Sequence, residues 1–145
     1  MAENPMVLIV DDDKIQRILM KKLFEKAGIK ASCATNGEEA LRKMGAHTFS
    51  CLITDLNMPC MNGIELADKA KSLAPRMLIA LCTGENFSNI RWNANYVKID
   101  AVFTKPINYS DMLRWVHRKV QKLNSAVPDG LQDDQLPEKS LRLLN

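Results

Sequence analysis

Polar residues able to act on a phosphate or a metal ion stand at the ends of apolar segments in this 145-residue chain. They are Asp11 and Asp12 after Met6 to Val10, Asp55 after Cys51 to Thr54, Thr83 after Met77 to Cys82, and Lys105 after Ala101 to Thr104. Carboxylates gathered at one place repel each other, by on the order of 4 kcal/mol per pair at about 4 Å and an effective dielectric near 20. A hard divalent cation, Mg²⁺ or Mn²⁺, would offset that repulsion, and the Lys105 ammonium would add a second positive charge.

Such a set suits phosphoryl transfer, which needs a nucleophile in line, a shared metal and donors for the remaining phosphoryl oxygens. Asp55 is the candidate nucleophile, because a carboxylate can form an acyl phosphate. Asp12 is the best direct metal ligand, and Asp11 would bind the metal through water. We expect the Thr83 hydroxyl to donate to one phosphoryl oxygen and the Lys105 ammonium to pair with another.

The apolar segments that carry these residues are typical of strands buried on both faces. Four are well defined and a fifth is weaker: Met6–Val10, Cys51–Thr54, Met77–Cys82, Ala101–Thr104 and the weaker Ala31–Ala34. Each well-defined run ends abruptly in a polar residue. One polar residue after a strand is usually a turn residue or a helix N-cap, and Asp13 is interpreted only as that. The complete set carries the hypothesis.

Between the runs, apolar residues recur with the period of a helix. The first predicted helix has Ile15, Ile18, Leu19, Leu23 and Ala27 on one face and ends before Gly28. The second covers Glu38–Met44, and the third has Ile64, Ala67, Ala70 and Leu73 on one face. A fourth is indicated by a thin apolar stripe over Asn86–Asn95, and the fifth has Met112, Leu113, Val116, Val120 and Leu123 on one face, with Ser110 as its N-cap.

Alternation of five strands with five helices predicts an α/β protein with a doubly wound, five-stranded parallel sheet, a flavodoxin-like (βα)5 arrangement. In the common strand order 2-1-3-4-5, the first and third strands are neighbours, and ligands gather beyond the carboxyl ends of the strands. The acids after 6–10 and 51–54 would then meet at one edge of the sheet.

The composition places limits on the other possibilities. An apolar fraction of 46% and a charged fraction of 26% are globular averages. We expect a cytoplasmic protein without membrane contact, since no run is long enough to span a bilayer and the first residues lack the features of a signal peptide. A net charge of +3 spread along helices predicts no direct nucleic-acid binding. Residues 1–124 are expected to form one domain, and 125–145 a linker or disordered tail.

Five segments, taken in order, resemble the response-regulator receiver domain of two-component signalling, in the CheY-like superfamily. They are Val7–Asp12, Leu52–Pro59, Met61–Gly63, Thr83–Gly84 and Thr104–Pro106. The resemblance covers about residues 5 to 124. It implies a signalling phosphoacceptor, not an enzyme, that assists its own phosphorylation and slow dephosphorylation.

This resemblance also implies specific roles. Asp55 would receive phosphate from a sensor histidine kinase or a phosphotransfer protein. Mg²⁺ would be held by Asp12, Asp55 and the backbone carbonyl of Asn57. A cis peptide bond would precede Pro106. Asn57 and Glu85 resemble positions that tune the lifetime of the phosphate.

In such a switch, phosphorylation would shift the Thr83 loop together with the helix at 86–95, the strand at 101–104 and the last helix, to control a downstream target protein or output domain. The same face would serve a homodimer. Two departures from the family pattern stand out. Val102 occupies a position that often holds an aromatic residue, with Phe103 pointing to the opposite side, and Asn62 replaces the commoner Asp before Gly63.

Two alternatives stay open at this point. One is a phosphatase resembling the haloacid dehalogenase superfamily, with Asp11 as nucleophile and Thr83 and Lys105 in its later motifs; Ile15 and the lack of a cap domain speak against it. The other is an interaction module that works independently of phosphorylation, which Val102 keeps open.

Overall fold

The structure, a computed structural model, describes residues 6–84 and 99–124. Within them lie five strands: β1 (Met6–Val10), β2 (Lys30–Ala34), β3 (Cys51–Asp55), β4 (Leu78–Thr83) and β5 (Ala101–Thr104). All neighbours pair in parallel, in the order β2-β1-β3-β4-β5. The predicted fold class is confirmed. The expected helix at 86–95, Glu85 and the expected tail at 125–145 lie outside the described residues.

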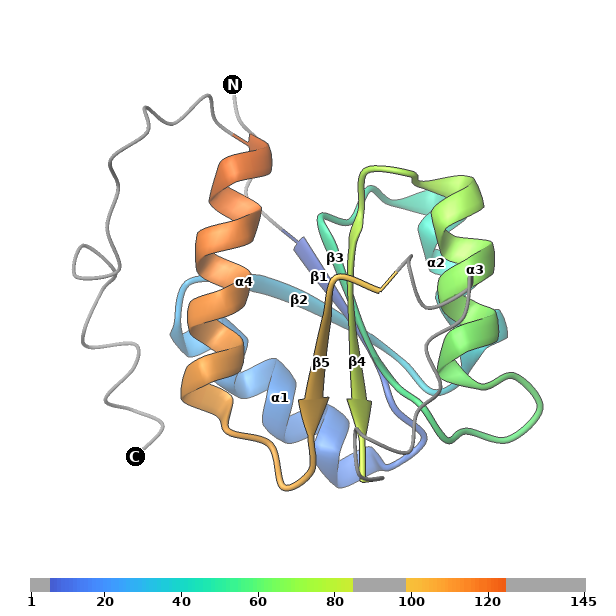
Figure 1. The fold of residues 1–145 in the computed structure, drawn as a ribbon, viewed down its shortest axis with the longest axis horizontal. Coiled ribbons are helices and arrows are strands. Elements are labelled where there is room, and N and C mark those ends of the chain that lie inside the picture. The colour runs from blue at the N-terminus through green and yellow to red at the C-terminus, as the bar shows by residue number, and fades with distance from the viewer. Residues whose placement is uncertain (1–5, 85–98, 125–145) are drawn as a thin grey trace.

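The described helices cover both faces of this sheet (Figure 1). They are α1 (Lys14–Lys26), α2 (Gly37–Ala46), α3 (Gly63–Leu73) and α4 (Tyr109–Asn124). Residues of α1 and α4 share one buried cluster, and residues of α2 and α3 share another on the opposite face. In the part of the chain that the structure describes, none of the helices has the length and apolar character needed to cross a bilayer.

Polar side chains fix where these helices begin. Asp13 caps α1, because its Oδ1 accepts the backbone N–H of Ile15 at 2.9 Å, as predicted. The prediction of Ser110 as the cap of the last helix was wrong. Asn108 has that place, since its Oδ1 accepts the N–H of Asp111 at 3.1 Å and α4 already begins at Tyr109. An Asn two residues earlier offers the same acceptor chemistry as Ser, so the sequence alone did not choose between them.

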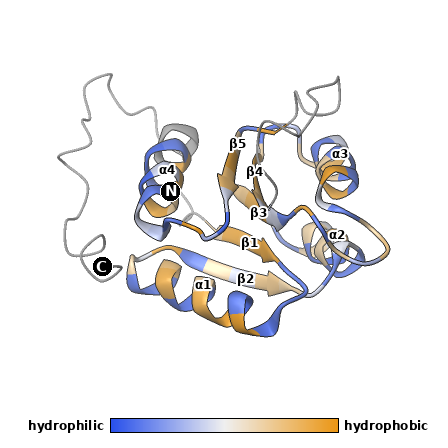
Figure 2. Cartoon of the chain, turned by 60° about the horizontal axis from the view of Figure 1, so that its bottom comes forward, coloured by the Kyte–Doolittle hydropathy of each residue, from blue (hydrophilic) through white to orange (hydrophobic). Residues whose placement is uncertain are grey.

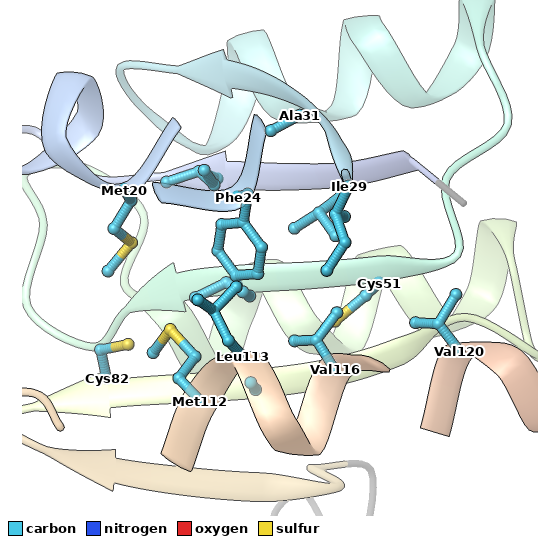
Figure 3. Packing of buried hydrophobic residues seen from close by; sticks show 14 residues of the cluster. Met20, Phe24, Ile29, Ala31, Cys51, Cys82, Met112, Leu113, Val116 and Val120 are labelled. Atoms are coloured by element: carbon cyan, nitrogen blue, oxygen red, sulfur yellow. The ribbon is translucent and has the colours of Figure 1, made fainter. Parts of the chain in front are cut away.

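The central strands are buried on both faces, and Figure 2 shows them in the hydrophobic colours. On the side of α1 and α4, Met20 and Phe24 point toward Met112 and Leu113 (Figure 3). This packing holds α1 and α4 against the same face of the sheet, and so brings together the N-terminal ends of the two helices.

The predicted buried face of the first helix was wrong. Ile15, Ile18 and Leu19 are 76%, 44% and 40% exposed, whereas Met20 and Phe24 fill the core. The helix carries two apolar stripes, and hydropathy does not distinguish them. The choice depends on tertiary packing, because Met20 and Phe24 are the residues of α1 that pack in the cluster shared with α4 and the sheet.

Candidate functional site

Three carboxylates meet beyond the carboxyl ends of β1 and β3. The two strands are neighbours in register, with Val10 opposite Thr54, so Asp11 and Asp55 come out at the same edge of the sheet. One oxygen from each of Asp11, Asp12 and Asp55 lies within 4.8 Å of the others. Asp11 and Asp55 are buried, while Asp12 is exposed. The expected convergence of these acids is therefore present.

Asp11 is held from two sides. Its Oδ1 accepts the backbone N–H of Asp13 at 2.9 Å, and its carbonyl oxygen accepts the Arg17 guanidinium at 2.6 Å. Burial raises the pKa of the Asp11 carboxyl, and the charges of Asp55 and Asp12 add to that rise. The N–H from Asp13 and the charge of Lys105 oppose it without cancelling it. Asp11 therefore carries a charge that the folded chain accommodates poorly by itself.

Asp55 is the last residue of the central strand β3. The next residue, Leu56, donates its N–H to the carbonyl of Cys82 on β4 at 2.8 Å, and accepts the N–H of Gly63 at 2.8 Å. These bonds hold the backbone after Asp55 between β4 and the start of α3. The carboxylate thus stands on a rigid strand end, which suits a group that must meet a reactant in one direction.

Lys105 faces the acids from the end of β5. Its backbone N–H donates to the carbonyl of Thr83 at 2.8 Å. Its Nζ lies 3.2 Å from Oδ2 of Asp55 and 4.0 Å from Oδ2 of Asp11. Partial burial acts to lower the pKa of Lys105, but the charge and hydrogen bond of Asp55 and the charge of Asp11 outweigh it, so the pKa is raised. The ammonium stays charged at neutral pH.

The bond between Lys105 and Pro106 is cis, as the resemblance implied. Thr83 ends β4 one residue beyond Cys82, which is paired with Asp55, and it is fully buried. Burial raises the pKa of the Cys82 thiol to about 12, so this neighbour of the acids is not a nucleophile at neutral pH. Asn57 lies two residues after Asp55 and is exposed.

Val102 and Phe103 point to opposite faces of β5, as expected of adjacent strand residues. Val102 packs against the small cluster of Leu56 and Leu81. Phe103 packs on the other face, edge-on to Trp115 of α4 with ring centroids 5.9 Å apart.

Sequence reasoning missed two groups that touch the edge of the site. Arg17 holds the Asp11 carbonyl, and the Tyr109 hydroxyl donates to Gln16 Oε1 at 2.8 Å. The Tyr109–Gln16 bond joins residues that are 93 positions apart in the chain. No spacing pattern signals such a contact, since it exists only because α1 and α4 pack side by side.

The donor set fits a hard divalent cation. Carboxylate oxygens are the ligands that Mg²⁺ prefers, and one or two of them suffice when water and phosphate oxygens complete the shell. The exposed side of Asp12 leaves the edge accessible to water and to a phosphate group. The acids would hold the ion where it also meets Asp55.

Comparison with known sequences supports the same family. Residues 7–117 match the profile of the response regulator receiver domain. The chain belongs to this family. Receiver domains are parts of two-component signalling systems, so this assignment displaces the alternative of a haloacid dehalogenase-like phosphatase.

Individual relatives agree with the assignment. The receiver domain is 30% identical to the response regulator receiver protein CpdR of Brucella abortus over 112 residues, covering 77% of this chain and 93% of CpdR. It superimposes on the response regulator TrrA of Thermotoga maritima, crystallised in complex with Mg²⁺ and BeF, with a TM-score of 0.69 and 29% identity over 82% of this chain and 98% of that one.

The autoinducer 1 sensor kinase/phosphatase LuxN of Vibrio campbellii is 34% identical over 84 residues, 58% of this chain. The chain spans only 10% of the length of LuxN. The likeness therefore concerns one part of a much longer sensor kinase.

Proposed function

We propose that this receiver domain is a phosphorylation-dependent switch in which Asp55 accepts a phosphoryl group from a sensor histidine kinase or a phosphotransfer protein. The observation that carries the proposal is the 3.2 Å approach of Lys105 Nζ to Asp55 Oδ2 at an edge that also holds Asp11 and Asp12. A carboxylate able to act as nucleophile, oxygens able to bind a metal ion and an ammonium group therefore lie close enough together to meet one phosphoryl group. The complex of TrrA with Mg²⁺ and BeF supports it by analogy.

In the proposed reaction, an oxygen of Asp55 attacks the phosphorus while the bond from phosphorus to the histidine nitrogen of the donor breaks. The bonding electrons leave with the imidazole, which takes a proton from solvent, and an acyl phosphate forms on Asp55. Mg²⁺, bound by Asp12, Asp55 and the Asn57 carbonyl and by Asp11 through water, would neutralise charge on the phosphoryl oxygens.

The other residues act on the remaining oxygens. Lys105 turns from the free carboxylate of Asp55 to a phosphoryl oxygen, a short move because its ammonium already contacts that side chain. The Thr83 hydroxyl donates to a further oxygen. Since Lys105 N–H also bonds the Thr83 carbonyl, the two donors are linked through the backbone.

The same link offers a route for the signal. A phosphoryl group that draws Thr83 and Lys105 inward would bias the ends of β4 and β5 and the start of α4 toward one of two arrangements. Val102 packs among aliphatic side chains, so the change would be read through β5 and α4 and not through an inward-turning aromatic ring. A target protein, an output domain or a second copy of the domain would bind this face.

The protein that donates the phosphoryl group would approach Asp55 over α1. Ile15, Ile18 and Leu19 are exposed, and Ile15 lies in the first turn, directly after the acids. Exposed apolar residues beside a reactive centre are typical of a protein contact. The match to the sensor kinase LuxN is consistent with a kinase as partner.

Incubation with acetyl phosphate and MgCl₂ tests the proposal, with intact-protein mass as the readout. We expect the wild type to gain the mass of one phosphoryl group and Asp55→Asn to gain none. Asp13→Asn is the matched control, because it makes the same chemical change two residues from Asp11 and keeps a capping side chain. Equal modification of wild type and Asp55→Asn would show that another residue accepts the phosphate.

A further inference from the structure

The hydroxyl of Tyr109 forms a bridge across the edge of the site. It donates at 2.8 Å to Oε1 of Gln16, and the bond is partly buried. Gln16 belongs to the first turn of α1, which follows the acids at Asp11 and Asp12. Tyr109 begins α4, four residues after Lys105. The bond thus joins the chain segment that carries two carboxylates to the segment that carries the ammonium.

The position of Lys105 depends on the loop that carries it. The side chain is long and 32% exposed, so packing alone does not hold its Nζ in one place. The loop is fixed before it by the bond from Lys105 N–H to the Thr83 carbonyl. After it, Ile107 and Tyr109 pack against the cluster between α1 and α4, and the Tyr109 hydroxyl reaches α1. The C-terminal end of the loop is therefore held against α1, the helix that follows Asp11 and Asp12.

We propose that the hydrogen bond between Tyr109 and Gln16 positions Lys105 for the phosphoryl group, which makes Tyr109 and Gln16 positioning residues of the site. This inference rests on the proposed function of Asp55. It deepens that function by naming what sets the distance between the cation and the nucleophile.

Other contacts already secure the start of α4 as a helix. Asn108 caps it, and Met112, Leu113 and Val116 bury its inner face. The Tyr109 hydroxyl adds no apolar burial, so its removal leaves these contacts in place. Removing the hydroxyl abolishes the hydrogen bond between Tyr109 and Gln16, which connects the start of α4 to the start of α1. The expected effect is therefore on binding of a phosphoryl analogue and not on the assembly of the fold.

The variants Tyr109→Phe and Gln16→Met remove donor and acceptor with little change in shape and none in charge. Beryllofluoride binding in saturating MgCl₂ and Mg²⁺ binding alone are measured by calorimetry. We expect each variant to bind beryllofluoride about fivefold more weakly, the size of one lost neutral hydrogen bond. Affinity for Mg²⁺ alone should not fall, since the carboxylates are untouched. The double variant should be no worse than either single one.

Ser72→Ala is the matched control, because it removes a hydroxyl that donates within α3 to Asp68 O, away from the acids. It should change neither affinity. Wild-type beryllofluoride affinity in the single variants would overturn the positioning role while leaving the proposed function standing. An equal loss of Mg²⁺ affinity would also overturn it, because the bond would then support the whole edge. If one variant does not fold, the other decides. A wild type that binds no beryllofluoride would contradict the proposed function itself.

Discussion

The backbone of Gly63 lies directly against the carbonyl oxygen of Asp55. A Cβ atom on Gly63 would clash with that oxygen, and would lie 2.8 Å from Cδ1 of Leu81 and 3.0 Å from the Cα of Leu56. Two of these three neighbours are backbone atoms that cannot rotate away. The start of α3 therefore approaches the strand end that carries Asp55, the proposed phosphoacceptor, through a residue without a side chain.

Gly63→Ala should damage both stability and metal binding. Overpacking typically costs about 1–3 kcal/mol, and relief here requires the Asp55 backbone to move. We expect the free energy of unfolding to fall by that amount in urea titrations, and the Mg²⁺ affinity to fall with it. Gly45→Ala is the control, since Gly45 lies in α2 with nothing within 4 Å of an added Cβ. It should gain about 0.5–1 kcal/mol. Similar stability of the two variants would contradict the close approach.

The positions of the strands were predictable because each strand is a continuous apolar run in the sequence. The convergence of the acids was predictable because few topologies are available to a parallel sheet with helices on both faces. Asp11 and Asp55 therefore converge as expected. The buried face of α1 was not predictable in this way. Ile15 and Met20 are both apolar, and only the packing of the helix on the sheet and against α4 decides that Met20 is inside.

Two side-chain hydrogen bonds at the edge of the site were likewise not predictable from the sequence. The Arg17 bond to the Asp11 carbonyl and the Tyr109 bond to Gln16 involve residue types that are common on helix surfaces. Each hydrogen bond can be recognised only when the positions of both partners in the fold are known. The candidate site residues could be predicted because they lie at or directly after the ends of strands. Arg17, Gln16 and Tyr109 lie in helices, and nothing in their spacing distinguishes them from other surface residues.

Asp11→Asn should stabilise the metal-free domain at neutral pH. Because burial raises the pKa of Asp11 in the folded state, the folded chain tolerates the charged form less well than the unfolded chain does. Above the raised pKa both states are charged and the folded state is penalised. Below the usual value of 3.8 the group is neutral in both states and the penalty is gone.

We therefore expect Asp11→Asn to raise the free energy of unfolding on the order of 1 kcal/mol at pH 7, the size typical when a functional site gives up strain. The gain should shrink as the pH falls toward 3.8. Urea titrations at several pH values without divalent ions measure it, with Asp13→Asn as the exposed control. A gain that is constant with pH would show that the charge of Asp11 is not its cause.

Mg²⁺ should stabilise the folded domain by mass action. An ion that binds only the folded state, at a concentration of 100 times its dissociation constant, adds about 2.7 kcal/mol to the free energy of unfolding. Thermal unfolding should thus shift upward in MgCl₂ but not in NaCl of equal ionic strength. Asp12→Asn should lose most of the shift and Asp13→Asn should keep it. Full retention in Asp12→Asn would mean that Asp12 is not a direct ligand.

The exposed face of α1 should matter for a protein donor and not for a small one. Ile15→Ala removes apolar surface next to the acids without changing charge, and Ile15 is 76% exposed, so the fold should tolerate it. Only the central residues of an interface cost more than about 1 kcal/mol when truncated. Ile15 lies directly after the acids and so at the centre of the proposed contact, and phosphoryl transfer from a phosphotransfer protein should slow about fivefold.

Phosphorylation of Ile15→Ala by acetyl phosphate should keep its wild-type rate, because Asp55, Lys105 and the proposed metal ligands are unchanged. Leu73→Ala is the matched control, as Leu73 is 62% exposed but lies at the end of α3. It should alter neither rate. The rate of transfer is measured by rapid quench with a phosphorylated protein donor that phosphorylates the wild type, and it is compared with the rate from acetyl phosphate. Equal slowing with both donors would place the effect of Ile15 on the site, and slowing in Leu73→Ala alone would move the docking face to α3.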